Sequence, residues 1–422
     1  MEFAGLPLMI QHQVWRNLPV PDRLRCEKVC RLWYQQMPYE DVTSFAYQFH
    51  KSNVHIEPLA VWLHARVRKW IRQLTISGKV IYLSPTAAEY LRQLYDLESL
   101  EITGFWSCSA EFLLLIPAAV KRLVLKPNDE SDEWLQMQMP SGWLNRLALL
   151  EEVNVDFIPI MERLTNRQMR RIKHEGGCCE GLDFDALLGC DKLQSLSVRS
   201  FGMHGFRGFM RLTCFSQLKE LNLVAISVCV PLNDFVRVLR SLGCLESLSF
   251  RLRELSTNEM TPHIPHLRSL KHLESCFASS CAYYILERLT TGGSINSFRF
   301  DCYRYKMTPD LAKIIVEATA LDLHNFAIID TTFYQRDDRH CIDCGWLLLF
   351  LVEFRPCMAT LEVMILKPED VLKAIEIRIR MLAQGCELPK LVITLLAIKG
   401  NEEIDPELLA TARMALVMKD VF

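Results

Sequence analysis

A short apolar pattern that recurs along most of the chain constrains the fold more than any other feature. It places apolar residues at its first, fourth and sixth positions. The last two of these fall at Leu74/Ile76, Leu100/Ile102, Leu123/Leu125, Val153/Val155, Leu196/Val198, Leu221/Leu223, Leu248/Phe250, Phe298/Phe300, Met364/Leu366 and Leu391/Ile393. Weaker copies lie at 169–172, 270–273 and 318–323. Most copies begin about 19 to 30 residues apart. Residues two apart on a strand face the same side, so each copy predicts a short strand with one buried face.

Strands this short are stable only when neighbouring copies pair, and the pairing predicts a parallel sheet. Such a sheet needs a crossover segment in every repeat, and helices usually supply it. Start signals for helices occur between copies at Ser84-Pro85, Asn233 or Asp234, Thr308-Pro309 and Pro368. The sequence therefore predicts an α/β fold with helices on one side of a parallel sheet. The alternative is an unrelated α/β domain whose strands are rich in leucine, which the persistent spacing disfavours.

The N-terminal residues 6–37 predict a separate group of three short helices. Leu6-Pro7 opens the first helix, and Ile10, Val14 and Leu18 follow at four-residue steps on one face. Pro19 and Pro21 end that helix, and Asp22 falls in the first turn of the next, where a negative charge suits the helix dipole. About forty residues cannot bury a large core alone. The apolar faces are therefore expected to meet a partner, unless the helices pack on their own domain.

The same N-terminal run resembles an F-box, the adaptor-binding module of SCF-type cullin–RING ubiquitin ligases. The matching positions are Leu6, Pro7, Ile10, Leu18, Asp22, Arg23, Cys26, Val29, Cys30, Arg31 and Trp33. Together with the repeats, the chain resembles an F-box/leucine-rich-repeat protein. This resemblance implies an α/β fold with an N-terminal three-helix F-box followed by an irregular leucine-rich-repeat solenoid, its parallel sheet on the concave side.

One feature of the repeats departs from that family. The family usually has Asn or Cys eight residues after the first apolar position, where it ties down the turn. Asn128 fills that position once. Elsewhere it holds Phe105, Phe201, Ile226, Arg253 and Tyr303. We therefore expect irregular turns in this chain.

The resemblance also implies a function, that of a non-catalytic substrate receptor. The Skp-family adaptor, which carries the cullin and RING subunits, would bind the F-box residues Leu6, Pro7, Ile10, Val14, Leu18, Pro19, Asp22, Arg23, Cys26, Val29 and Trp33. A protein substrate would lie on the concave face, whose candidate contacts are Glu101, Arg122, Asn154, Lys173, Arg199, Asn222, Arg251, Glu274, Arg299 and Asp301. Their mixed charges suit a protein surface more than nucleic acid. A repeat scaffold that binds partners without a ubiquitin-ligase role is the second interpretation.

The expected domain boundaries follow from these patterns. The F-box is assigned to residues 1–45, a linking strand and helix to 46–70, and the repeats to 71–422. Residues 405–419 predict a helix that caps the open end of the stack. Residues 128–148 are expected to form a long crossover rather than a protruding loop.

Composition excludes several functional classes. The 422 residues carry a formal net charge of −2, and 23% of them are charged, so no excess positive charge favours nucleic acid or an acidic membrane. No apolar run approaches the ~20 residues of a membrane-spanning helix, and the N-terminus lacks a signal-peptide pattern. The sixteen cysteines are scattered, as reduced thiols in a cytoplasmic or nuclear protein would be.

Motifs for catalysis or cofactor binding are missing from the sequence. There is no glycine-rich phosphate loop, Gly-x-Ser-x-Gly elbow or His-Glu-x-x-His. His340, Cys341 and Cys344 have zinc-ligand spacing but lack a second paired motif. Cys178 and Cys179 near His174, like Cys341, would be the candidate nucleophiles of a hydrolase, but nothing orients a base beside them. We therefore predict no enzymatic activity, metal or cofactor.

Overall fold

The computed structural model describes residues 6–29, 31–50, 54–108, 110–127, 142–155, 164–174, 184–200, 208–256, 267–277, 295–301, 325–329, 360–365, 383 and 390–395. These residues form two compact units, one up to Leu193 and one from Gln194 onward. The helices expected after Thr308 and Pro368, the capping helix at 405–419 and the cluster at 340–344 lie outside the described residues.

The first unit begins with the three-helix module, made of α1 (Leu8–Arg16), α2 (Val20–Glu27) and α3 (Arg31–Gln36). Pro7 and Pro19 occupy the N-cap positions of α1 and α2, where a proline costs no hydrogen bond. Asp22 lies in the first turn of α2. A proline therefore precedes each of the two helices as predicted, but α1 already ends at Arg16, before Leu18, and Pro21 lies inside the first turn of α2 instead of between the helices.

The sheet of the first unit is parallel throughout. Its order is β1 (Ser44–Gln48), β3 (Gln73–Leu83), β4 (Ser99–Cys108), β5 (Arg122–Pro127), β6 (Glu152–Val155) and β7 (Arg171–His174). The short strand β2 (Val54–His55) pairs with the far end of β3. Phe45 and Tyr47 of β1 align with Leu74 and Ile76, so the sheet begins before the expected residue 71.

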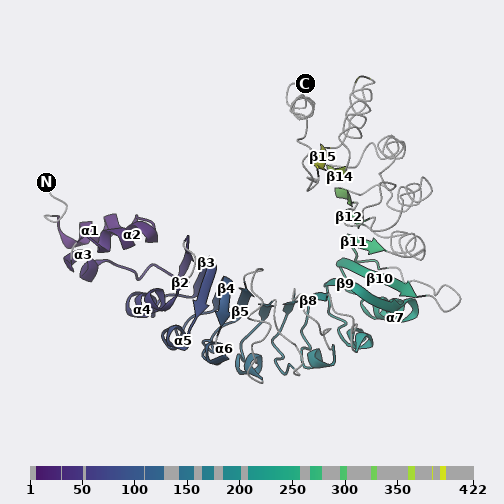
Figure 1. The fold of residues 1–422 in the computed structure, drawn as a ribbon, viewed down its shortest axis with the longest axis horizontal. Coiled ribbons are helices and arrows are strands. Elements are labelled where there is room, and N and C mark those ends of the chain that lie inside the picture. Colours follow the sequence, from purple (N-terminus) through teal and green to yellow (C-terminus); the bar gives the residue numbers. More distant parts are fainter. Residues whose placement is uncertain are drawn as a thin grey trace. The chain divides into compact units, whose positions relative to one another are not determined.

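Helical crossovers join these strands, and Figure 1 shows α4 (Glu57–Arg66), α5 (Pro85–Arg92) and α6 (Ala110–Leu114) following one another along one side of the sheet. The Ser84 Oγ accepts a hydrogen bond of 3.1 Å from the Ala87 N–H and so caps α5 as predicted. Later crossovers contain the short 3₁₀ helices η3 (Trp143–Arg146) and η4 (Phe184–Leu187). Trp143 is buried, in agreement with a crossover in this region.

The second unit has the same construction. Its parallel strands, in order, are β8 (Ser195–Ser200), β9 (Glu220–Pro231), β10 (Ser247–Ser256), β11 (His272–Phe277), β12 (Ser297–Asp301), β13 (Asn325–Ile329), β14 (Thr360–Ile365) and β15 (Lys390–Leu395). The crossovers include η5 (Phe209–Cys214) and α7 (Leu232–Ser241). Helix α7 begins one residue before Asn233, with Pro231 as its N-cap and no side-chain cap.

The predicted apolar positions lie side by side in neighbouring strands. In the first unit one buried row runs through Leu74, Leu100, Leu123, Val153 and Ile172. In the second unit the equivalent buried row contains Leu196, Leu221, Leu248 and Leu273, and the backbone of Phe298 aligns with Leu273. The repeat spacing therefore predicted the inward-facing residues of an α/β fold with a large parallel sheet.

Two later copies of the pattern were placed wrongly. Phe326 and Ile328 align with Phe298 and Phe300, so β13 lies beyond the expected 318–323. In β14, Leu361 aligns with Leu391, the place expected for Met364. Both segments contain overlapping apolar patterns, and pairing with the neighbouring strand selects one of them.

Strands β4 to β7 and β9 to β12 each begin at the same pair of backbone hydrogen bonds. The carbonyl of Arg72 accepts from the N–H groups of Glu98 and Ser99 at 2.8 and 2.9 Å. The carbonyls of Glu98, Lys121, Glu151, Gln194, Lys219, Glu246 and Lys271 do the same for the next repeat. These shared acceptors hold successive strands in register at their first residue.

The strands become irregular a few residues later. Register shifts occur between β3 and β4, between β4 and β5, and between β9 and β10. The shift in β4 falls between Thr103 and Phe105, and Phe105 is fully buried. An apolar side chain here packs into the core and cannot tie down the turn as Asn would. The expectation of irregular turns is confirmed at this position.

Candidate functional site

The clearest candidate surface is the apolar part of the three-helix module that its own core leaves uncovered. Ile10 and Val14 lie one turn apart on α1 and are each 41% exposed. Leu8, Met9 and Val29 are also exposed. Leu18, predicted on the same helical face, lies beyond the end of α1 and is half-buried, so only Ile10 and Val14 of the predicted three are exposed on the helix. Large apolar side chains gathered on a small module mark a surface that another molecule can cover.

The module also has a small core of its own. Trp15 is 1% exposed, and its ring lies 6.0 Å from the ring of Trp33 in an edge-on arrangement. Trp33 and Cys26, both assigned to the adaptor surface from the sequence, are half-buried. Leu6 and Asp22 are also half-buried, whereas Pro7 and Pro19 are exposed. Trp15 was missed, although its i, i+3 spacing from His12 and Leu18 was available.

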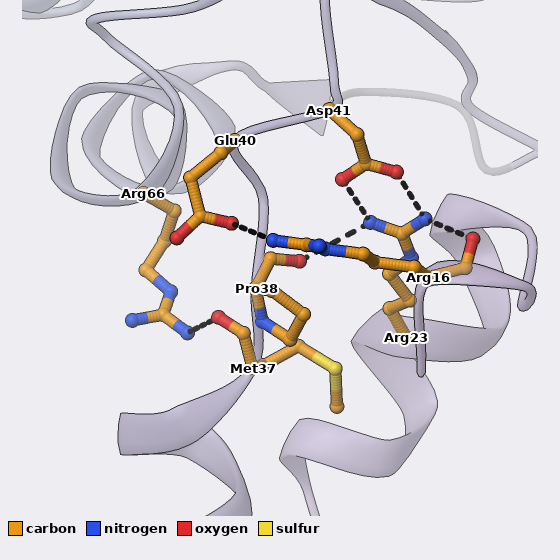
Figure 2. Close-up of polar contacts among 7 residues, drawn as sticks. All are labelled: Arg16, Arg23, Met37, Pro38, Glu40, Asp41 and Arg66. Carbon is orange, nitrogen blue, oxygen red and sulfur yellow. Dashed lines mark hydrogen bonds and ion pairs between the residues drawn. The ribbon is translucent and has the colours of Figure 1, made fainter. Parts of the chain in front are cut away.

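Arg23 does not lie at the expected adaptor surface. Only 3% of Arg23 is exposed, and its guanidinium forms a two-pronged ion pair with Asp41, each N–O distance being 2.7 Å (Figure 2). It also donates to the carbonyls of Arg16, Leu18 and Pro38 at 2.7 to 3.1 Å. Arg23 therefore holds the end of α1 against the segment that follows α3. Its hydrogen bonds also lower the pKa of Asp41.

A second, mostly buried arginine joins the module to the first crossover helix. Arg66 of α4 pairs with Glu27 of α2 at 2.8 Å and donates to the carbonyls of Tyr34 and Met37, at the end of α3 and just beyond it. Figure 2 shows the bond to the Met37 carbonyl. Trp62, one turn earlier on α4, donates to the other oxygen of Glu27 at 3.2 Å. Glu27 is 8% exposed. The module is thus fixed to α4 by a buried ion pair whose partners are well hydrogen-bonded.

Neither arginine contact was predicted. One signal was available, because Arg23 and Glu27 are four residues apart and share a face of α2. A lone pair of opposite charges on a helix is more often solvated, so the pattern did not indicate burial. No local sequence pattern around Asp41 or Arg66 predicts their ion pairs.

The sheet face opposite the helices carries the residues predicted to meet a substrate. In the first unit two of them, Glu101 and Arg122, bind each other across neighbouring strands, and further charged residues extend this row of ion pairs. Arg122 lies 3.1 Å from Glu101 and 3.8 Å from Glu152, and Arg171 lies 3.2 Å from Glu152. Such half-exposed pairs contribute little stability, about 0–1 kcal/mol each. Lys173 and Asn154 are half-buried on the same strands.

The same face of the second unit has small polar side chains at its centre. Asn222 donates to the Ser197 Oγ at 3.1 Å, and the Ser249 Oγ donates to Glu274 at 3.3 Å. Nearer the strand starts, Glu246 lies between Lys271 and Lys219, and these two lysines lower its pKa. The predicted residues Arg199, Arg251, Arg299 and Asp301 lie on strands β8, β10 and β12.

The remaining chemical candidates give no site within the described part of the chain. His174 is buried in β7, and its Nδ1 lies 3.1 Å from the Val155 carbonyl. Cys178 and Cys179 lie outside the described residues. Cys190 is a buried thiol whose pKa burial raises to about 12, whereas Cys214 and Cys244 are exposed. The residues described contain no group of three or more potential metal ligands. They also contain no helix long and apolar enough to cross a bilayer.

Comparison with known proteins assigns no family. No family model matches the chain, and no curated protein matches its sequence. The functional argument therefore depends on the surfaces described above.

Proposed function

We propose that this chain is the substrate-recognition subunit of an SCF-type ubiquitin ligase, with an F-box at its N-terminus and leucine-rich repeats after it. The observation that carries the proposal is the apolar surface of α1. Ile10 and Val14 are exposed although Trp15 and Trp33 fill the centre of the module. A module with its own core and an uncovered apolar face fits docking on a Skp-family adaptor.

The repeats would hold the protein substrate. Their sheet face offers charged and amide side chains of both signs, which is typical of surfaces that bind polar protein epitopes. The cullin and RING subunits, carried by the adaptor, would bring the ubiquitin-conjugating enzyme to the bound substrate. The chain would contribute proximity, because a tethered lysine attacks as if at a high local concentration.

The contacts of Arg66 support this separation of an adaptor-binding module from substrate-binding repeats. The Arg66–Glu27 pair and the Arg66 bonds to the Tyr34 and Met37 carbonyls fix the module to α4. A docking module fixed to the first repeat would transmit the position of the adaptor to the neighbouring strands, whereas a flexible tether would not.

The test is capture of a purified Skp-family adaptor by the full-length protein. Ile10→Asp combined with Val14→Asp places two charges on the exposed face, and both sites tolerate polar groups because they are solvent-accessible. We expect capture to fall more than about a hundredfold, since each charge would be buried unpaired at the interface. Unfolding curves should match the wild type.

Tyr95→Asp is the matched control. Tyr95 is 72% exposed in the same unit but lies outside the module, so its substitution should leave capture unchanged. Failure of the wild-type protein to capture the adaptor would overturn the proposal and favour a repeat scaffold without a ligase role.

A further inference from the structure

Among the described strands, none pairs with the outer edge of β1. β1 pairs only with β3, where the Thr43 carbonyl accepts from the Gln73 N–H and the Phe49 N–H donates to the Ser77 carbonyl. Backbone groups of alternate residues point to opposite edges of a strand. The N–H and C=O groups of Ser44, Ala46 and Gln48 therefore point away from β3. No backbone or side-chain partner for them occurs among the described residues.

This edge lacks the features that usually keep sheet edges from pairing. Natural edges are protected by lysines, prolines, bulges or a covering element. Residues 43–49, Thr-Ser-Phe-Ala-Tyr-Gln-Phe, contain no charge and no proline. Ser44, Ala46 and Gln48 are all exposed, and the pairing of β1 with β3 runs without a register shift. The edge is straight, neutral and accessible.

Aromatic side chains flank the open backbone. Tyr47 is 36% exposed, and its ring stacks on Phe45 at 6.1 Å and meets Phe49 edge-on at 4.8 Å. Phe45 itself is buried against Trp62 of α4. A strand added beside β1 would place alternate side chains against Tyr47, and apolar or aromatic side chains pair best with such a neighbour. The other face of the strand presents the small or polar side chains of Ser44, Ala46 and Gln48.

We propose that the edge of β1 binds an extended segment of a partner protein, which adds to the sheet as a further strand. Unpaired donors and acceptors at every second residue are complementary to another extended backbone, and this mode of recognition takes its affinity from main-chain hydrogen bonds. The neutral edge with its exposed tyrosine selects a segment of alternating apolar residues without clustered charge.

A second copy of this chain fits the edge less well. If the β1 edges of two copies paired, the whole sheet and the crossover helices of the second copy would have to fit beside β1. Trp62 of α4 contacts both Phe45 of β1 and Glu27 of the three-helix module, so the module itself lies close to this end of the sheet and limits the room there. A single added strand needs only ~4.8 Å of space beside β1.

The experiment uses a displayed library of random heptapeptides, panned on the full-length wild-type protein, and the enriched peptides are then assayed for binding to Ala46→Pro. Proline removes the outward N–H of Ala46, and edge strands tolerate it because that N–H has no internal partner. Ala46→Thr keeps the N–H and serves as the matched control. We expect enriched peptides to show alternating apolar residues. They should bind Ala46→Pro at least about tenfold more weakly than wild type or Ala46→Thr, since a backbone hydrogen bond is lost and a ring is added.

Methylation of the peptide tests the same geometry without changing the protein. Methyl groups on the backbone nitrogens of one alternate set of residues should abolish binding, and those on the other set should not, because only one set faces β1. Peptides that bind wild type and Ala46→Pro equally, or no enriched peptide at all, would overturn the inference. A wild-type dimer that Ala46→Pro makes monomeric would overturn it in favour of a second copy. The Ile10→Asp/Val14→Asp variant should retain peptide binding, which separates this site from the adaptor surface.

Discussion

Arg23 and Arg66 show how a charged residue can serve as a core residue. Both are buried or nearly so, and each joins one carboxylate to carbonyl groups at helix ends, which are otherwise left without partners. The planar guanidinium has five N–H donors, so it can satisfy several such acceptors at once. In a module too small for a large apolar core, these contacts replace some of the missing packing.

His174 is a residue of a different kind, because it occupies an apolar position of the repeat. It aligns with Val155 in the row that contains Ile76, Ile102 and Leu125. Burial lowers the pKa of His174 from its ordinary value of 6.5, and the hydrogen bond with the Val155 carbonyl opposes this only in part. The folded protein therefore keeps the imidazole neutral.

The first prediction concerns pH. Because its folded-state pKa is lowered, His174 takes up a proton more readily in the unfolded chain. Stability should therefore fall as the pH drops below about 6.5, by at most ~1.4 kcal/mol per pH unit from this residue. In the His174→Leu variant, the free energy of unfolding of the first unit should change less between pH 7 and pH 5. Urea unfolding at several pH values measures this change. An unchanged slope in the variant would contradict the assignment.

At the scale of single elements, strand β4 shows why the irregular turns occur where they do. Gly104 has φ +80°, a backbone conformation that glycine adopts without cost, and it lies against the backbone of Gly78 in β3. The bend lets Phe105 enter the core and the strand continue to Cys108. A pair of glycines therefore supports the close approach of two strands just before Phe105.

The second prediction compares two glycines. A Cβ at Gly104 would lie 1.7 Å from the Gly78 carbonyl oxygen, so Gly104→Ala should destabilise the first unit by roughly 1–3 kcal/mol or more. A Cβ at Gly243, after α7, would meet no other atom within 4 Å, so Gly243→Ala should be neutral or stabilising by about 0.4–1 kcal/mol. Chemical unfolding measures both. Equal losses of stability in the two variants would contradict the close contact between Gly104 and Gly78.

At the scale of the whole molecule, each compact unit has its own rows of buried residues. Leu100 and Ile102 belong to the first unit, and Leu248 and Phe250 belong to the second; all four are at most 1% exposed. Stacked repeats are stabilised mainly by their nearest neighbours in the stack, so a local loss of packing spreads gradually along the chain. Each unit should therefore have its own free energy of unfolding.

The third prediction follows from this arrangement. Leu100→Ala should cost about 2–5 kcal/mol of local stability, because it removes a fully buried side chain and leaves a cavity. Amide hydrogen exchange should accelerate in β3, β4 and β5 and remain unchanged in β9 and β10. Leu248→Ala should produce the reverse. Equal acceleration in both units after either substitution would show that they unfold as one.

Local patterns of the sequence determined the parallel α/β fold, the prolines that precede the first two helices and the inward rows from Leu74 to Leu273. They succeed because side-chain direction within a strand or helix depends only on nearby residues. The tertiary structure alone decided which overlapping pattern forms β13 and β14, that β1 is the first strand of the sheet, and that Arg23 is buried beside Asp41. Those outcomes depend on partners distant in sequence, and no local period records such pairings.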